Sequence, residues 1–283
     1  MAPSYPTRTG ERPKMHADRW LAYRKTAVRP GNYLLRSLDS DTFDALSPHL
    51  EILNLPNGYT LRASGDALDY LYFPAGCVLN IQGELADGST AELTAVSCNG
   101  FLGAGALIGV RLPWGVVTAV HGGQLARVRR AAATTILRRA PHVLDEMLRY
   151  VVFSLHLMSM SVVCQRHHSL DQRLARWLSC MTFLTNDSRF DITHDQLGRF
   201  LGVRREGVSE TMKQFECAGL VASSRGHVDV IDSARLRQRS CGCIDEGREM
   251  FMRFFPHRSI SYALPTRTAA KHVAQEQRYA EAG

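Results

Sequence analysis

Residues 192–231 read ITHDQLGRFLGVRREGVSETMKQFECAGLVASSRGHVDVI, and this stretch decides the fold of the C-terminal half of the chain. Thr193 and Gln196 have the spacing of a capping box, which predicts that a helix begins there. Gly198 is small where a second helix would have to cross closely, and Gly202 suits a tight turn between two helices. The stretch therefore opens with a short helix that ends at a turn.

A second helix is predicted from about Arg204, because its apolar residues Val208, Met212 and Phe215 recur four and three positions apart. Gly219 follows in the position of a helix C-cap. Val221 and residues 227–231 then predict two strands around a turn at residues 224–226. Two helices, a tight turn and a hairpin together predict a winged helix-turn-helix, which is a DNA-reading shape.

The composition agrees with an anionic partner. The chain has 283 residues, a net charge of +7 and a pI near 9.2. A basic balance favours nucleic acid, although membrane surfaces attract basic proteins too. The length exceeds that of most single domains, so we expect two domains with extensions.

Apolar runs, the N-terminal composition and the cysteines indicate where in the cell the protein is expected. We expect no membrane span, because no run approaches the roughly 20 apolar residues that a spanning helix needs. The N-terminal residues are polar and rich in Pro and Arg, unlike a signal peptide, so we expect a cytoplasmic protein. In that reducing compartment most cysteines should be free thiols; they are Cys77, Cys98, Cys164, Cys180, Cys217, Cys241 and Cys243.

Short strand-like runs separated by turn residues fill the N-terminal half, which predicts an antiparallel sandwich or jelly roll. The runs are 51–55, 60–63, 70–73, 77–82, 91–96, 115–121 and 124–128. We assign residues 30–140 to this β-roll, with short helices in 33–50, and residues 1–29 to a flexible basic tail.

A long helix is predicted over residues 141–168. Its apolar positions alternate in steps of four and three, which is the spacing of a coiled-coil seam; they are Leu144, Leu148, Val151, Leu155, Met158 and Val162. The simplest interpretation is a parallel dimer interface, and the alternative is a helix that packs only on its own domain. An amphipathic helix at 170–185 then opens a DNA-binding domain over 169–246, and residues 247–283 are assigned to a C-terminal tail.

This order resembles the Crp/Fnr family of bacterial transcription regulators. Three runs carry the resemblance: LPNGYTLRASGDALDYLYFPAGCVLNI at 55–81, CQRHHSLDQRLARWLS at 164–179, and THDQLGRFLGVRREGVSETMKQFECAGLV at 193–221. It implies an α+β fold, made of a cyclic-nucleotide-binding-like antiparallel jelly roll, a long dimerisation helix and a C-terminal winged helix-turn-helix. It also implies a homodimeric, sequence-specific DNA-binding regulator that is not an enzyme. The implied partners are double-stranded DNA with a palindromic operator, and RNA polymerase.

By the same resemblance, base edges are read by Arg205, Glu206, Ser209 and Glu210. Arg205 can bond a guanine edge through two hydrogen bonds, and Glu206 can accept from a cytosine amino group. Glu210 departs from the family, which usually has an arginine there, so we expect an operator that differs from the family's best-known one. The remaining predicted DNA-binding residues, whose basic members would contact phosphates, are Thr193, Arg204, Lys213, Ser224 and Arg225.

The family's nucleotide binders hold the ribose with a Gly-Glu pair and the cyclic phosphate with a nearby arginine. Here the matching stretch, FLGAGALI at 101–108, has Ala104 at the acidic position, and Arg111 lies before the expected place. We therefore expect a roll that does not bind cyclic AMP in the family's manner, and that binds a more apolar effector or nothing. The expected pocket residues are Leu102, Ala104, Arg111 and Trp114.

Other chemistry is less well supported. A [4Fe–4S] sensor of this family clusters its cysteines near the N-terminus, whereas the first cysteine here is Cys77. Near the end of the long helix, Cys164 with His167 and His168 is interpreted as a buried thiol rather than a metal site. The Cys241-Gly-Cys243 pair is too short for a disulfide or a complete zinc site, which leaves pairing across a dimer or simple exposure. We expect no metal and no cofactor.

The placement of the histidines argues against a cupin-type metalloenzyme. A cupin-type enzyme needs a His-x-His pair with a further Glu and His on its strands, and only His121 lies in the later strands. A second hypothesis remains, in which the chain is a small-molecule or thiol-redox sensing module that acts through a protein partner. The salt dependence of DNA affinity separates the two hypotheses, because phosphate contacts make binding fall steeply with salt.

Overall fold

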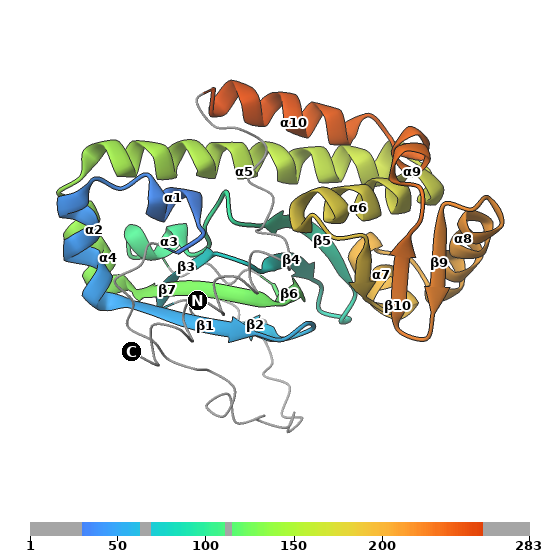
Figure 1. Ribbon diagram of the computed structural model, residues 1–283, viewed down its shortest axis with the longest axis horizontal. Coiled ribbons are helices and arrows are strands. Elements are labelled where there is room, and N and C mark those ends of the chain that lie inside the picture. Colours follow the sequence, from blue (N-terminus) through green and yellow to red (C-terminus); the bar gives the residue numbers. More distant parts are fainter. Residues whose placement is uncertain (1–29, 63–68, 111–114, 257–283) are drawn as a thin grey trace, which may run out of the picture.

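The structure is a computed structural model that describes residues 30–62, 69–110 and 115–256. The predicted tail at 1–29 and the end of the predicted C-terminal tail lie outside these ranges. A β-roll occupies one end, a winged unit the other, and one long helix runs along both (Figure 1). The predicted α+β class, with an antiparallel roll and a C-terminal winged helix-turn-helix, is confirmed.

Short helices lead into the roll: α1 (Tyr33–Arg36), α2 (Ser40–Leu46) and the 3₁₀ turn η2 (Ser47–His49). Asn32 fixes this entry. Its side-chain oxygen accepts from the backbone NH of Leu35, and its amide group donates to the carbonyls of Pro74 (2.9 Å) and Gly100 (2.8 Å). The buried Asn32 side chain therefore has partners on three segments, as a buried amide requires.

Two antiparallel sheets form the roll. One has the strand order β1-β7-β3, with bounds Leu50–Leu55, Gly123–Arg129 and Tyr70–Pro74. The other has the order β2-β6-β4-β5, with bounds Thr60–Arg62, Val117–His121, Val78–Glu84 and Thr90–Val96. Each predicted run corresponds to one strand, because alternating inward residues such as Leu53 and Leu125, which face each other across β1 and β7, are buried.

Helices α3 (Ala104–Leu107), α4 (Arg130–Leu137) and α5 (Pro141–His167) follow the roll. The buried side of α5 packs on the roll at four residues: Val143, Met147, Tyr150 and Phe153. The opposite side leaves Leu148, Val152, Leu155, Val162 and Val163 exposed. The helix is therefore apolar on both sides, and only one side is covered.

Helix α5 departs from our expectation about membrane spans. Among the described residues it is the one helix long and apolar enough to cross a bilayer, with a mean hydropathy of 1.5 over its best window. Length and composition alone are weak evidence. Because the roll packs on one side of the helix throughout its first half, lipid could not surround it in this fold.

The winged unit contains α6 (Leu170–Thr185), α7 (His194–Leu201), α8 (Arg205–Cys217) and α9 (Ser233–Arg239). Its sheet has the order β8-β10-β9, with bounds Arg189–Asp191, His227–Val230 and Val221–Ser224. The two strands of the wing were predicted, whereas β8 was not. The core of this unit is continuous with Val78 and Cys98 of the roll, so the winged unit packs directly on it.

The last described helix, α10 (Cys243–Phe254), corrects the assignment of residues 247–283 to a tail. It lies along α5 (Figure 1) and contributes Phe251 and Phe255 to the core of the roll. The ring centre of Phe153 on α5 lies 5.5 Å from that of Phe251 and 6.0 Å from that of Phe255, with the planes close to perpendicular. The chain thus returns from the winged unit to cover α5.

Candidate nucleic-acid interface

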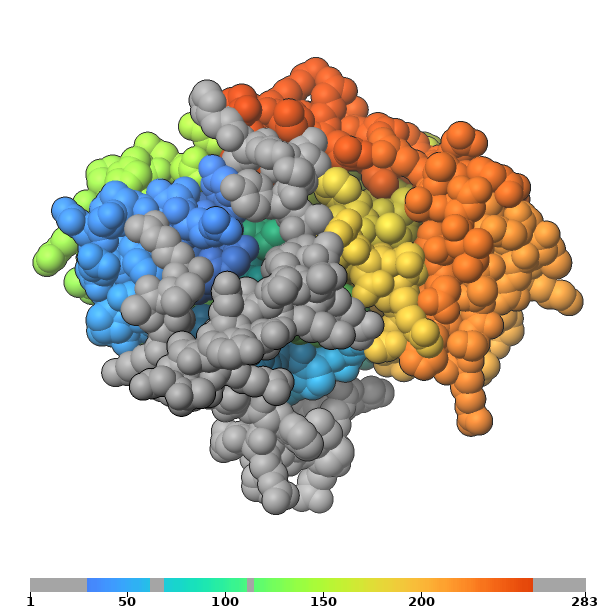
Figure 2. Space-filling view, in the orientation of Figure 1, coloured from blue at the N-terminus to red at the C-terminus, as the bar shows by residue number. Residues whose placement is uncertain are grey.

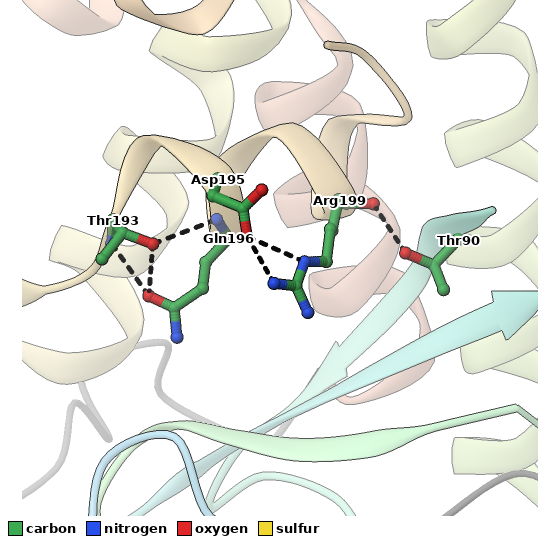
Figure 3. A network of polar contacts seen from close by, with 5 residues as sticks. All are labelled: Thr90, Thr193, Asp195, Gln196 and Arg199. Carbon is green, nitrogen blue, oxygen red and sulfur yellow. Dashed lines mark hydrogen bonds and ion pairs between the residues drawn. The ribbon is translucent and has the colours of Figure 1, made fainter. Parts of the chain in front are cut away.

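Helix α7 begins at the predicted capping box. The Thr193 hydroxyl accepts from the backbone NH of Gln196 (3.2 Å), and the Gln196 side chain accepts from the backbone NH of Thr193 (2.8 Å) (Figure 3). These bonds satisfy two backbone donors that a helix start otherwise leaves unpaired. The helix ends at Gly202, whose φ of 64° is a left-handed conformation that glycine adopts without strain.

Helices α7 and α8 cross closely at Gly198. A Cβ atom on Gly198 would lie 2.9 Å from the carbonyl oxygen of Val203, so only glycine fits without a shift. The backbone NH of Val203 donates to the Gly198 carbonyl at 2.9 Å, which closes the turn. Behind the crossing, Val208, Met212 and Phe215 are fully buried. The predicted apolar face therefore holds α8 at a fixed angle.

The opposite face of α8 is open. Five of the predicted DNA-binding residues on or next to this helix are exposed: Arg204, Arg205, Glu206, Glu210 and Lys213. Within the described ranges, no ion pair joins any of the three cations in this group to an acid. Their charges are therefore available to a phosphate backbone, and α8 has the length and exposure to enter a major groove.

Ser209 is the exception, because it is half-buried. Its hydroxyl donates to the Arg205 carbonyl (3.1 Å) and lies 2.9 Å from Nδ1 of His194 on α7. Burial lowers the pKa of His194, and the nearby Arg205 lowers it further, while Glu216 opposes the shift. His194 was missed in the sequence, where a histidine after a capping threonine carries no distinctive signal.

The wing carries the other predicted contacts. Ser224 and Arg225 are exposed at the turn between β9 and β10. Glu216 of α8 accepts hydrogen bonds from the backbone NH (2.9 Å) and the hydroxyl of Ser223, which ties the wing to the end of α8. The wing and α8 therefore form one unit with a polar outer surface.

Helix α7 docks on the roll through strand β5. The Thr90 hydroxyl donates to the Arg199 carbonyl at 3.4 Å, while the Arg199 side chain bonds Asp195 on its own helix (Figure 3). Nearby, the Asn57 amide donates to Asp191 at 2.8 Å. These contacts connect α7 and strand β8 of the winged unit to the domain that would hold an effector.

Glu92 connects β5 to α6 in the interior. Its carboxylate accepts from Trp177 Nε1 at 2.8 Å and from the Asn80 amide. Burial raises the pKa of Glu92, while Arg176 and these two donors lower it. The ring of Trp177 also stacks on Phe200 of α7, at 5.8 Å between ring centres. The half-buried Glu92 thus bonds α6 directly, and the ring of Trp177 extends the contact to α7.

The predicted effector region borders a cavity of about 150 Å³ between the roll and α5. Leu102 and Ala104 line it, whereas Arg111 and Trp114 lie outside the described residues. No Asp, Glu, Lys or Arg is present among the described lining residues, whose polar groups are the hydroxyls of Thr94, Tyr150 and Ser154. An uncharged ligand therefore fits this lining better than a negatively charged cyclic phosphate does.

The residues predicted to form the dimer interface fall into an exposed group and a half-buried group. Leu148, Leu155 and Val162 are exposed on the outer side of α5, whereas Leu144, Val151 and Met158 are half-buried beside the roll. Val151, Leu155 and Met158 also line the cavity described above. The seam therefore runs along the edge of the exposed apolar stripe, next to the cavity.

The chain is similar in sequence to known transcription regulators. Residues 172–239 match the Crp-like helix-turn-helix domain. The CRP-like cAMP-activated global transcriptional regulator of Mycobacterium tuberculosis is 20% identical over 214 residues, which cover 73% of this chain and 96% of the relative.

Two solved structures have a similar fold. A transcriptional regulator of the crp/fnr family from Eubacterium rectale has a TM-score of 0.60 and 19% identity, covering 73% of this chain and 96% of the other. The c-di-GMP responsive global regulator CLP of Xanthomonas campestris has a TM-score of 0.55 and 17% identity, covering 69% and 100%. At 19% and 17% sequence identity, these two likenesses show that the fold is shared.

Proposed function

We propose that this chain is a transcription regulator of the Crp/Fnr type, as its Crp-like helix-turn-helix domain and its fold suggest, and that it binds a specific DNA sequence as a homodimer. The observation that carries this proposal is the exposed face of α8. Its cations are unpaired within the described chain, while its apolar side is buried. That division is what a recognition helix needs, since one side must be rigid and the other must reach bases.

The residues on this face have different roles in the proposal. Arg205 at the start of α8 donates to a guanine edge, and Glu206 accepts from a cytosine amino group. Glu210 lies one turn further along, where its carboxylate repels phosphates and accepts only from cytosine or adenine amino groups. Arg204, Lys213 and Arg225 contact phosphates, and so set affinity more than sequence.

The exposed stripe of α5 supports the dimer. Leu148, Val152, Leu155 and Val162 follow one another at steps of four, three and seven, which places them on one side of the helix. A second copy of α5 would cover this stripe in a parallel pair. The two recognition helices would then meet half-sites roughly 34–36 Å apart, which is one turn of DNA and explains a palindromic operator.

We expect the roll to respond to an effector other than cyclic AMP bound in the family's usual manner. Ala104, at the first position of α3, supplies no acceptor for ribose hydroxyl groups, and the described cavity lining carries no cation for a phosphate. A buried phosphate without such a partner would lose hydrogen bonds of about 1–3 kcal/mol each. A less polar molecule avoids that loss.

Selection of genomic fragments by the purified protein, followed by footprinting, tests the proposal. We expect a palindromic site with half-sites one turn apart, and affinity that falls steeply with salt. Cyclic AMP should leave both the affinity and the melting temperature unchanged. If no sequence is selected at any salt concentration and the salt slope is near zero, the proposal fails, and the alternative of a sensing module that acts through a protein partner is favoured instead.

The implied setting is the bacterial cytoplasm, with RNA polymerase as the protein partner of the DNA-bound dimer. Capture of RNA polymerase on operator DNA, with and without the regulator, tests this part. An unchanged amount of captured polymerase would argue against a direct contact.

A further inference from the structure

Four potential metal ligands converge where α5 meets the winged unit. They are Cys164, His168, Cys241 and Cys243, and their ligand atoms all lie within 4.8 Å of one another. Cys164 and Cys241 are almost completely buried, at 1% and 3% exposed, and the other two are half-buried. Of the two alternatives for the Cys241-Gly-Cys243 pair, simple exposure does not agree with the burial of Cys241.

The distances match a single tetrahedral ion. The Sγ atoms of Cys164 and Cys241 are 3.6 Å apart, and Cys243 Sγ lies 3.6 Å from His168 Nδ1. Around zinc, with Zn–S bonds of about 2.3 Å and Zn–N bonds of about 2.1 Å, tetrahedral geometry places two sulfurs roughly 3.8 Å apart and a sulfur and a nitrogen roughly 3.6 Å apart. Two edges of the required tetrahedron are therefore already close to their final lengths.

The fold assembles this group from two segments that are far apart in the sequence. Cys164 and His168 are four residues apart at the end of α5, so they project on the same side. Cys241 precedes the N-cap of α10, and Cys243 is the first residue of that helix. Since Cys164 and Cys241 lie 77 positions apart in the sequence, neither half is a recognisable motif alone.

The surroundings favour a negatively charged group. Two arginines of α6 are close to the cysteines, and within the described chain the Nε atoms of Arg173 and Arg176 are buried without a hydrogen-bond partner. Three thiolates around a divalent ion leave one negative charge, which these buried cations would balance.

We propose that Cys164, His168, Cys241 and Cys243 bind one zinc ion in a closed Cys₃His site. Three thiolates and one imidazole form a donor set that suits tetrahedral zinc. A cluster of several irons would need ligands spread more widely than a single ion does. A disulfide between Cys164 and Cys241 would require their sulfurs to approach to about 2.05 Å, and would leave Cys243 and His168 without a role.

The site has a structural consequence. All four positions of the ion are filled by protein, so no position remains for a substrate. The ion joins the end of α5 to the α9–α10 junction, next to α6, whose surface lies beside that of α9 and α10 (Figure 2). It thereby fixes the direction in which the chain leaves the long helix at Ser169, the N-cap of α6. This role goes beyond DNA binding and does not depend on it.

Metal analysis of the purified full-length protein tests the site. We expect about one zinc per chain by mass spectrometry of the metal. After removal of zinc under reducing conditions, titration with Co²⁺ should give the thiolate-to-cobalt absorption of several sulfur ligands and the intense d–d bands of tetrahedral cobalt. Zinc should displace the cobalt and raise the melting temperature of the stripped protein by several degrees.

Substitutions identify the ligands. Cys243→Ser and His168→Gln should each weaken Co²⁺ binding at least tenfold and change its spectrum, whereas the controls Cys217→Ser and His167→Gln should not; Cys217 and His167 are exposed. The Co²⁺ titration of the unaltered protein decides the matter even if a variant fails to fold. The proposal is overturned if reduced protein takes up neither metal, if both ligand variants bind as tightly as the unaltered chain, or if the isolated protein holds a Cys164–Cys241 disulfide instead of metal.

Discussion

Arg205 and Lys213 both extend from the exposed face of α8, but they should differ in what they contribute to binding. Arg205→Ala removes a donor pair for one base, so discrimination at that base pair should fall by about 1–3 kcal/mol. Lys213→Ala removes a phosphate contact, so affinity should fall for all sequences alike and the salt slope should decrease by about one. Binding assays with single-base variants of the operator, at several salt concentrations, measure both effects. Equal losses on every sequence for Arg205→Ala would contradict its assignment as a base-reading residue.

His194 should make DNA affinity depend on pH. Burial lowers its pKa below the ordinary 6.5, and bound phosphates would raise the pKa again. The complex then holds more protons than the free protein, so affinity should increase several-fold as pH falls from about 8 to about 6. The stability of the folded chain depends on pH in the opposite direction. Because folding lowers the pKa of His194, its contribution to stability is complete above pH 6.5 and is lost as the pH falls through the lowered pKa.

The matched variant is His194→Gln, which keeps a hydrogen-bonding group beside Ser209 but cannot titrate. Fluorescence anisotropy with labelled operator at constant ionic strength should show a flatter pH profile for this variant. A profile identical to that of the unaltered protein would assign the pH dependence to another group.

The close crossing of α7 and α8 predicts a steric effect. Gly198→Ala places a Cβ atom 2.9 Å from the Val203 carbonyl oxygen, so the turn must shift, and unfolding free energy should fall by roughly 1–3 kcal/mol. Gly247→Ala in α10 is the control, because its Cβ would lie at an ordinary 3.4 Å from Leu157; there alanine should stabilise by roughly 0.5–1 kcal/mol. Urea denaturation measures both. Equal stability of the two variants would show that the crossing can relax.

The exposed stripe of α5 predicts the oligomeric state. Leu148 and Val152 are 61% and 52% exposed in one chain, so replacing both by Asp should leave the monomer folded. Paired across a dimer, the same carboxylates would be buried and unpaired, so light scattering should report a monomer and DNA affinity should fall more than tenfold. Thr135→Asp, on the exposed side of α4, adds a charge elsewhere and should keep the dimer. A stable dimer of the double variant would place the interface on another surface.

Elements with a strong local pattern could be predicted from the sequence. The strands of the roll, the capping box of α7 and the turn at Gly202 each depend on residues close together in the chain. Strand β8 was missed because three residues give too short an alternation, and it exists only because β10 pairs with it. Helix α10 was missed because its phenylalanines pack against Phe153, which lies about a hundred residues earlier in the sequence.

At the scale of the whole molecule, Glu92 and Trp177 join the roll to the winged unit. Trp177→Phe keeps a ring against Phe200 but leaves the half-buried carboxylate without its 2.8 Å donor, so the free energy of unfolding should fall by about 1–3 kcal/mol. Glu92→Gln keeps a carbonyl acceptor and removes a half-buried carboxylate, so the free energy of unfolding should fall by less than it does in Trp177→Phe. A double-mutant cycle by urea denaturation measures the coupling between the two residues. Additive effects would mean that this hydrogen bond does not hold the two units together.

The sequence could not predict which residues from distant parts of the chain come together in the candidate sites. The exposed residues of α8 follow from helical periodicity, so they could be named in advance. The contact of α7 with Thr90, the cavity beside α5 and the Cys₃His group depend on how separate elements pack. Packing is decided by complementarity of whole surfaces, for which one sequence contains no local signal.

Strand β5 reaches from the cavity to the reading unit. Thr94 and Val96 line the cavity beside α5, whereas Thr90 bonds α7 and Glu92 bonds α6. Four residues of extended chain separate Thr94 from Thr90, which is roughly 13 Å at about 3.3 Å per residue. Strand β5 therefore connects the lining of the cavity directly to a backbone carbonyl of α7, the first helix of the reading unit.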